Sequence, residues 1–268
     1  MPDSEKKTFW DHLDDLRGSL LRSIVAAAVA SVAAFCCKDF LFRVVLAPCD
    51  SRFVTYRLLA RLTHHDVSFH ANLVNIELTQ QVMTHLKVAF GAGLLVVTPY
   101  IIYELLRFLS PALYRNERRY TTCAVVWGYA LFVVGLLMSY YLIFPFTFRF
   151  LYSYQVRADV TNVVSLSSYV STFGILGLMM GTTCELPLLC WLLAKLGLLQ
   201  SAFMTRYRRH AVVAVLALAA VVTPTADAFT MLVVALPIYL LYEISILVVR
   251  RTERRDASQE TKRNVTTA

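Results

Sequence analysis

Long uncharged stretches of apolar residues, separated by short polar segments, dominate this sequence. A helix needs roughly 20 predominantly apolar residues to cross the hydrocarbon core of a bilayer, which is about 30 Å thick. The pattern predicts six such helices, at residues 20–42, 86–107, 120–144, 165–194, 209–223 and 229–249. The expected fold class is therefore an all-α membrane protein, a single integral membrane domain over residues 1–268 with a tail at 250–268.

Three of the connections carry further information. Twelve strictly apolar residues, Ala211 to Val222, reach only about 18 Å at the helical rise, so the fifth helix is expected to be short. The uncharged run from Tyr120 to Phe148 is long enough for the third helix plus a turn at Pro145. The first external loop, at about 43–82, is long enough to fold as a cap over the bundle, with Asn75 as a candidate cap for the second helix.

The distribution of basic residues predicts the orientation. With the N-terminus inside, 18 of the 26 Lys and Arg residues fall on inner segments and 8 on outer ones. This bias agrees with the positive-inside rule and places both chain ends in the cytoplasm of a prokaryote, with the helices in its inner membrane. The acidic N-terminal segment lacks the basic start and short apolar core of a cleaved signal peptide, so the first helix is expected to stay as an anchor.

Composition excludes several classes of function. The chain is 57% hydrophobic and 16% charged, and its net charge of +8 comes from residues that flank apolar runs, which argues against nucleic acid as a partner. Six cysteines form no C-x-x-C pair and six histidines show no metal spacing, so neither a disulfide framework nor a metal site is expected. There is no P-loop, G-x-S-x-G or H-E-x-x-H motif, which predicts a protein that is not an enzyme and needs no cofactor.

Carboxylates inside the predicted helices are candidate functional groups, because an ionisable side chain is costly in hydrocarbon. Glu185 follows Gly177 and Gly181 at steps of four, so the three residues share one helix face, where glycines allow close helix approach. Glu185 then lines a polar cavity or binds a cationic partner, or it is a protonated, hydrogen-bonded structural group. For Asp227, Glu104 and Glu243, an interfacial solvated carboxylate and a functional one are both open.

Two further carboxylates lie on the predicted inner surface. The segment from His12 to Arg17 leads into the first helix, and residues 108–119 link the second and third helices. These segments place Asp15 and Glu117 beside apolar side chains. A carboxylate suits recognition of a guanidinium, which offers a planar fork for two hydrogen bonds, but pairing with Arg17 or Arg118 is the alternative.

At these residues the sequence resembles the TatC family of twin-arginine translocase proteins. The matching segments occur in the family's order and are HLDDLR at 12–17, FLSPALYRNERR at 108–119, SYYLIFPFTFRFL at 139–151, CELPLL at 184–189 and TPTADAFTMLVVALPIYLLYEIS at 223–245. The resemblance covers about residues 8–250. It implies the same six-helix architecture that the apolar pattern predicts.

The resemblance also implies a function: a receptor at the core of a translocase, which binds twin-arginine signal peptides and exports folded proteins using the proton motive force. Its implied partners are TatA- and TatB-like single-span proteins and further copies of the chain in one complex. The residues implied or expected to contact the signal peptide are Asp15, Glu117, Leu16, Arg17, Phe108 and Leu113.

Other positions carry further expectations. Glu185 is the intramembrane polar site, Met231 and Leu216 are expected partner contacts because the fifth helix is short, and Pro48, Pro99 and Asp227 are structural or loop positions. The chain departs from the family at Asp15, where Glu is common, and at Glu104 and Met231, where Gln is frequent. A different class of function, an ion-coupled secondary transporter with Glu185 as its proton or substrate site, is the alternative, although no inverted repeat is visible.

Overall fold

The computed structural model describes residues 9–50, 52–63, 73–109, 118–154, 157, 163–223 and 227–266, almost all of them helical. Within these described residues, five segments are long and apolar enough to cross a membrane: Leu16–Cys36, Gln80–Arg107, Ala124–Ser153, Leu166–Lys195 and Ala228–Arg254. They belong to the helices α1 (Phe9–Cys36), α4 (Gln80–Leu109), α5 (Arg118–Met138) with α6 (Phe144–Ser153), α7 (Leu166–Cys184) with α8 (Leu186–Lys195), and α11 (Ala228–Thr266).

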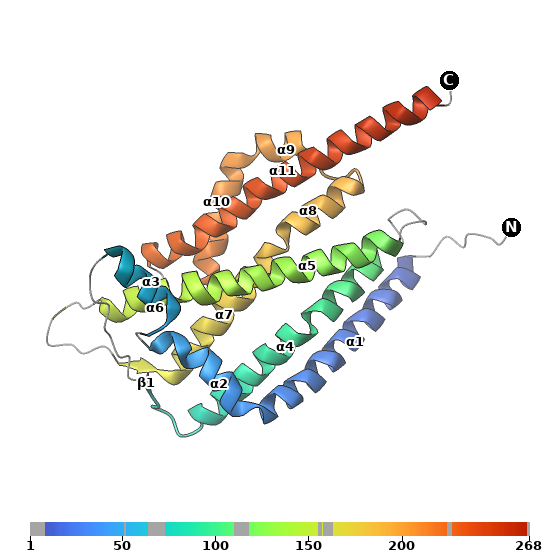
Figure 1. Cartoon of the computed structure of the whole chain (residues 1–268). Coiled ribbons are helices and arrows are strands. Elements are labelled where there is room, and N and C mark those ends of the chain that lie inside the picture. Colours follow the sequence, from blue (N-terminus) through green and yellow to red (C-terminus); the bar gives the residue numbers. More distant parts are fainter. Residues whose placement is uncertain are drawn as a thin grey trace.

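The fifth predicted helix is the short one. Helix α10 (Arg208–Val222) has 15 residues, or about 22 Å at the helical rise, and the six-residue α9 (Ser201–Arg206) precedes it. The helices run side by side, and the described chain begins and ends at the same end of the bundle (Figure 1). We call this the terminal end and the opposite one the loop end. The predicted fold class, an all-α membrane protein, is confirmed.

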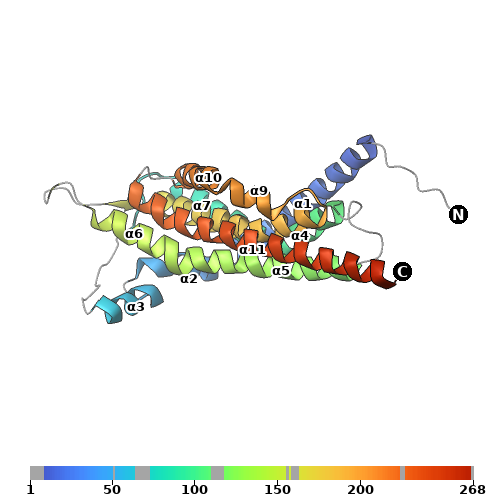
Figure 2. The ribbon, with the colours of Figure 1, turned by 90° about the horizontal axis from the view of Figure 1, so that it is seen from above.

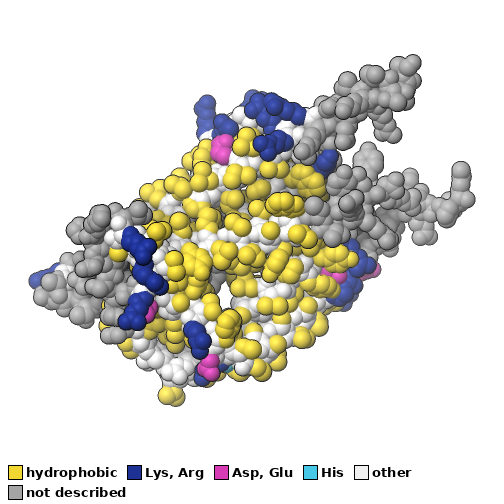
Figure 3. All heavy atoms as spheres, in the orientation of Figure 1, with side chains coloured by type: hydrophobic (Ala, Val, Ile, Leu, Met, Phe, Trp, Pro, Cys, Tyr) yellow, Lys and Arg dark blue, Asp and Glu magenta, His cyan; other side chains and the backbone are white. Residues whose placement is uncertain are grey.

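The surface agrees with this class. Hydrophobic side chains form a broad belt over the visible face of the bundle, and Lys and Arg side chains gather toward its ends (Figure 3). Many large apolar side chains of the spans are exposed, such as Val96 at 70% and Val213 at 66%, as expected for groups that meet lipid. Helix α11 continues beyond the apolar span, so the tail predicted at 250–268 begins as an extension of the last helix.

The first external loop is structured at the loop end. It contains α2 (Lys38–Leu46), the 3-10 turn η1 (Ala47–Cys49), α3 (Val54–Thr63) and a short strand β1 (Leu73–Val74). Strand β1 pairs in parallel with β2 (Val164–Ser165), which ties this loop to the start of α7. Helices α2 and α3 lie beside the bundle rather than along its axis (Figure 2).

Two details of this region differ from the expectations. The first helix ends at Cys36 and the chain turns at Cys37, so residues 38–42 belong to α2 and not to the first span. Asn75 does not cap α4, which begins five residues later; the Gln80 side chain instead accepts hydrogen bonds from the amides of Ile76 and Glu77, at 2.8 and 3.2 Å.

Tyrosine hydroxyls hold α2 in place. The last carbonyls of a helix have no partner within it, and near the end of α2 two of them receive hydroxyl groups from elsewhere. Tyr140 donates to the Val44 carbonyl at 3.0 Å and Tyr169 to the Val45 carbonyl at 2.8 Å. Burial raises the pKa of the neighbouring Cys49 thiol to about 11, so this side chain packs as a neutral group.

The turn predicted at Pro145 is wrong, because the helix continues through this residue. Proline lacks the amide that would bond to the carbonyl four residues earlier, here Tyr141. A π-helical turn, η3 (Ser139–Ile143), joins α5 to α6 and relieves the clash. The Thr55 hydroxyl of α3 donates to the freed Tyr141 carbonyl, and the Tyr56 hydroxyl donates to the carbonyl of Pro145 at 3.2 Å.

A second proline interrupts the fourth predicted helix. Pro187 has no amide for the carbonyl of Thr183, and the helix breaks between α7 and α8 at Glu185, whose amide bonds to the carbonyl of Thr182 at 3.1 Å. The break turns α8 away from the axis of α7 (Figure 1).

Glycines set the separation of the central helices. A Cβ atom on Gly135 of α5 would lie 2.6 Å from the Met180 carbonyl oxygen of α7, and one on Gly181 would lie 2.7 Å from the Phe132 ring. On the other side of the bundle, a Cβ atom on Gly93 of α4 would lie 2.5 Å from the backbone nitrogen of Ser31 in α1. Only glycine permits such close backbone contact. The van der Waals packing that results stabilises the helix pairs, because no hydrophobic effect drives helices together in lipid.

The tyrosine anchor of α2 gives a test of stability. The Tyr169 side chain is buried, and Tyr169→Phe would leave the Val45 carbonyl without its hydroxyl donor. An unsatisfied buried acceptor costs about 1–3 kcal/mol, so we expect the thermal midpoint in detergent to fall by several degrees. The exposed Tyr129, changed to Phe in the same way, should leave the midpoint unchanged. Equal midpoints for both variants would contradict the anchoring role.

Candidate functional site

Four of the residues expected to bind a signal peptide lie in the described helices α1 and α4, toward the terminal end of the bundle. Leu16 and Arg17 lie on α1 and are exposed. Asp15 is in α1 and Phe108 in the last turn of α4, but their side chains lie outside the described part, as do Leu113 and Glu117 entirely. The structure therefore brings positions 15–17 and position 108 to the same end, because α1 and α4 pack along each other and the start of α1 lies beside the end of α4 (Figure 1).

An ion pair between Arg22 of α1 and Glu104 of α4 joins these two helices close to that end. The Arg22 Nε and Nη2 atoms lie 3.3 and 3.1 Å from Oε1 and Oε2 of Glu104, which is the two-pronged geometry that favours guanidinium over ammonium. The Tyr100 hydroxyl donates to Glu104 at 3.1 Å, and Arg22 also donates to the Ser19 hydroxyl at 3.1 Å.

The burial of this pair is uneven. The Glu104 side chain is 4% exposed and that of Arg22 is 52% exposed, while Arg107 approaches the same carboxylate at 3.9 Å. Glu104 is thus not the solvated interfacial carboxylate that was one of the two interpretations. Three donors satisfy it between the helices, so its role is to hold α1 against α4. Sequence reasoning missed Arg22 and Tyr100, although Arg22 and Glu104 both interrupt apolar runs on the same predicted side of the membrane.

Helical spacing extends this contact toward the terminal end. Position 15 precedes Arg22 by seven residues, or two turns, so both positions are on the same face of α1. Position 108 follows Glu104 by four residues on α4. The ion pair therefore fixes the α1 face that carries position 15 relative to the α4 face that carries position 108.

Glu185 lies deeper, at the break between α7 and α8. Along α7, Gly177, Gly181 and Glu185 all face α5, which is the shared face that their spacing predicted. A Cβ atom on Gly128 of α5 would lie 3.2 Å from the Glu185 carboxylate, so the glycine leaves room for it. The Oε1 atom is buried and has no hydrogen-bond partner among the described residues. Unlike Glu104, this carboxylate has no cation in contact within the described chain.

The α10–α11 side contains the remaining candidates. Asp227 accepts a hydrogen bond from the Thr230 amide at 2.7 Å and so caps the start of α11. Glu243 is ion-paired with Arg208 of α10 at 2.9 Å and accepts the Tyr239 hydroxyl at 3.0 Å. The expected partner contacts, Leu216 and Met231, are only partly buried, against the core cluster. More exposed apolar side chains on the same two helices are Val213, Leu232 and Leu236.

Pro48 and Pro99 have structural positions. Pro48 is buried in η1, where its ring lies at the start of the turn, and Pro99 lies inside the continuous helix α4. Among the described residues, no group of three His, Cys, Asp or Glu side chains could hold a metal ion.

The chain is similar to known proteins of one family over most of its length. The family described as Sec-independent protein translocase protein (TatC) matches residues 11–237. The chain is 32% identical over 250 residues to the TatC protein of Blattabacterium sp. subsp. Periplaneta americana, covering 90% of this chain and 94% of that one. It is 31% identical over 258 residues to TatC of Desulforapulum autotrophicum, covering 96% and 90% of the two chains.

A solved structure has a similar fold. The crystal structure described as the twin arginine translocase receptor TatC superposes with a TM-score of 0.75 at 26% identity. The match covers 90% of this chain and 99% of the solved one. The likeness therefore extends over nearly the whole of both chains.

The ion pair gives a prediction about stability. Glu104→Ala leaves the Arg22 guanidinium without its carboxylate and opens a cavity between α1 and α4, so we expect a lower thermal midpoint in detergent. Exchanging the two charges, Arg22→Glu with Glu104→Arg, should recover part of the loss, whereas Arg17→Ala on the exposed face of α1 should have no effect. If the exchanged double variant is no more stable than Glu104→Ala alone, the pair does not hold the helices together.

Proposed function

The chain belongs to the TatC family of Sec-independent protein translocase proteins, and from this premise we propose that it is the component that binds twin-arginine signal peptides. One observation supports the proposal most directly: the two-pronged Arg22–Glu104 pair holds α1, the helix that carries Asp15, against α4, the helix that carries Phe108. In this proposal Asp15 and Phe108 are presented by two helices that are already packed together, and Glu117 completes the patch.

The chemistry of the patch accounts for selectivity. Asp15 and Glu117 each accept two hydrogen bonds from one guanidinium of the paired arginines, whereas a lysine offers only a compact point charge. Leu16, Phe108 and Leu113 contact the apolar segment of the signal peptide and add affinity without distinguishing arginine from lysine. Arg17 keeps the local charge from becoming strongly negative, so that peptide release remains easy.

The same proposal sets the orientation and the partners. The terminal end lies in the cytoplasm, the loop end faces outward, and the bundle crosses the inner membrane. Single-span proteins of the TatA and TatB type dock at α10 and α11, where a helix of about 22 Å meets a hydrocarbon core of about 30 Å. Leu216 and Met231 border this surface, and the exposed Val213, Leu232 and Leu236 extend it. Further copies of the chain assemble in the same complex, which exports folded proteins using the proton motive force.

Glu185 also enters the proposal, as a group needed during transport. Its unpartnered Oε1 is the observation that would favour an ion-coupled secondary transporter. Membership of a translocase family argues against a small solute, so we assign Glu185 instead to contact with a polar or cationic group of a partner or cargo that enters beside α5 and α8.

The signal-peptide site can be tested by titration. A labelled twin-arginine peptide is titrated against the wild type, Asp15→Ala and Glu117→Ala in detergent or nanodiscs. Charge-assisted hydrogen bonds contribute about 1.5–3 kcal/mol, so each substitution should weaken binding roughly 10- to 100-fold. Asp15→Glu should bind normally. A twin-lysine peptide is the control, and it should bind weakly to every variant. Unchanged affinity in both alanine variants would end the proposal for this patch.

The role of Glu185 can be tested separately from folding. Glu185→Gln keeps the shape of the side chain and removes its charge, so we expect normal insertion and thermal midpoint together with strongly reduced export of a twin-arginine cargo. Thr183→Ser, two residues away and without a charge change, serves as the matched control. Export at the wild-type rate by the Gln variant would show that Glu185 is a structural group.

A further inference from the structure

A cationic and hydroxyl cluster lies at the loop end, remote from the sites described above. The Lys87 Nζ atom of α4 donates to the Ser171 hydroxyl of α7 at 3.1 Å and lies 3.5 Å from the Ser167 hydroxyl. Lys87 is exposed and has no carboxylate partner among the residues that the structure describes. A lysine ammonium in such a position is a charge that still needs an anion.

Some of the hydrogen-bond donors in this cluster have no acceptor within the described chain. The ammonium has three N–H groups and uses two of them on the serines, which accept through their oxygens. Neither serine hydroxyl donates a hydrogen bond within the described chain. One N–H and two O–H groups are therefore available together, which is the donor set that a phosphate oxygen pair accepts.

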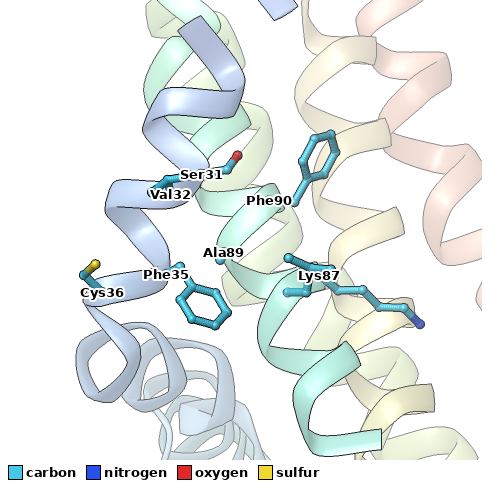
Figure 4. A pocket seen from close by; sticks show the side chains of 8 residues that line it. Ser31, Val32, Phe35, Cys36, Lys87, Ala89 and Phe90 are labelled. Atoms are coloured by element: carbon cyan, nitrogen blue, oxygen red, sulfur yellow. The ribbon is translucent and has the colours of Figure 1, made fainter. Parts of the chain in front are cut away.

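An apolar groove adjoins this cluster. It has a volume of about 540 Å³ and lies between α1 and α4, with Val32 and Phe35 on one wall and Leu86 and Phe90 on the other (Figure 4). The stem of Lys87 belongs to the same wall, and its amine points away from α1 (Figure 4). The groove is open on the outer surface of the bundle, since Val32 is 69% exposed and Phe90 is 56% exposed.

Depth in the membrane relates the two features. Lys87 is seven residues from the start of α4, or about 10 Å along the helix, and Ser167 and Ser171 are in the first two turns of α7. A lysine at this depth extends its amine to the headgroup region while its stem stays among apolar groups. Lys87 also lines the groove, so the cluster and the groove adjoin each other at this level, near the loop end.

We infer that this surface binds one anionic phospholipid of the loop-end leaflet. Its phosphodiester lies on Lys87, Ser167 and Ser171, and one acyl chain lies in the groove between α1 and α4. Charge complementarity selects an anionic lipid, because the cation has no other counter-ion in the described chain. The apolar groove on the same wall selects a lipid rather than a free anion.

The bound lipid would also cover the α1–α4 seam where Gly93 meets Ser31. It would fill an exposed gap beside the closest helix contact on that side of the bundle and so join the loop-end cap to the first span. This role is independent of signal-peptide recognition at the opposite end.

The test uses the full chain in nanodiscs that contain phosphatidylcholine with a small fraction of a phosphatidylglycerol analogue carrying a photoreactive group on one acyl chain. The yield of covalent adduct and its position are measured by mass spectrometry. We expect adducts on α1 or α4 beside the groove. Lys87→Gln should lower the yield about tenfold, as loss of a charge-assisted hydrogen bond predicts. Lys38→Gln, which removes an exposed lysine at the same end, should not change it.

Two further measurements distinguish a bound lipid phosphate from a free phosphate ion. Val32→Trp fills the groove and should lower the yield while Lys87 is intact. Excess inorganic phosphate should not compete, because it lacks an acyl chain. Competition by phosphate, an unchanged yield in Lys87→Gln at the wild-type thermal midpoint, or an equal loss in Lys38→Gln would each overturn the lipid site. Signal-peptide affinity should be the same in every variant, so these outcomes leave the proposed function untouched.

Discussion

The fold depends on one constraint: in hydrocarbon, every backbone carbonyl and amide must find a partner inside the protein. Helices meet this demand alone except where proline removes an amide. At Pro145 the freed Tyr141 carbonyl is taken by Thr55 of α3, and the Pro145 carbonyl is taken by Tyr56. The external cap therefore sits where it does because a proline in the third span provides acceptors for it. The same need at the end of α2 is met by Tyr140 and Tyr169, which come from the second half of the chain.

Close packing follows from a related limit, since lipid provides no hydrophobic force between helices. Glycines at 135 and 181 bring α5 and α7 into contact, and Gly128 leaves a space further along that seam. Glu185 occupies this space because Pro187 breaks the helix there. Pro187 and Gly128, which belong to different helices, thus make room for a carboxylate that two regular, closely packed helices would exclude.

Local sequence signals predicted the features that repeat within one helix. The apolar runs predicted an all-helical chain, the steps of four from Gly177 to Glu185 gave their common face, and the run from Ala211 to Val222 predicted a short helix there. Features that depend on a distant partner were not predictable. Continuation through Pro145 needs Thr55, whose bond to Tyr141 spans 86 residues, and the burial of Glu104 needs Arg22, 82 residues away. The break at Cys37 is different, because a local signal was present: the charged residues Lys38 and Asp39 follow it directly.

Three charged side chains of the bundle, Glu104, Lys87 and Glu185, differ in how they are satisfied, and this difference suggests different roles. The Glu104 carboxylate accepts hydrogen bonds from Arg22 and Tyr100 and is thereby satisfied within the bundle. We therefore assign it only the role of holding helices together. Lys87 has part of its donor set filled by serines and part open toward the lipid. Glu185 has a buried oxygen without a partner in the described chain. An unsatisfied carboxylate in a low-dielectric site is costly, which is why we propose that a partner or cargo completes this group during transport. In these proposals the three groups therefore range from a structural pair, through a lipid contact, to a group that acts in transport.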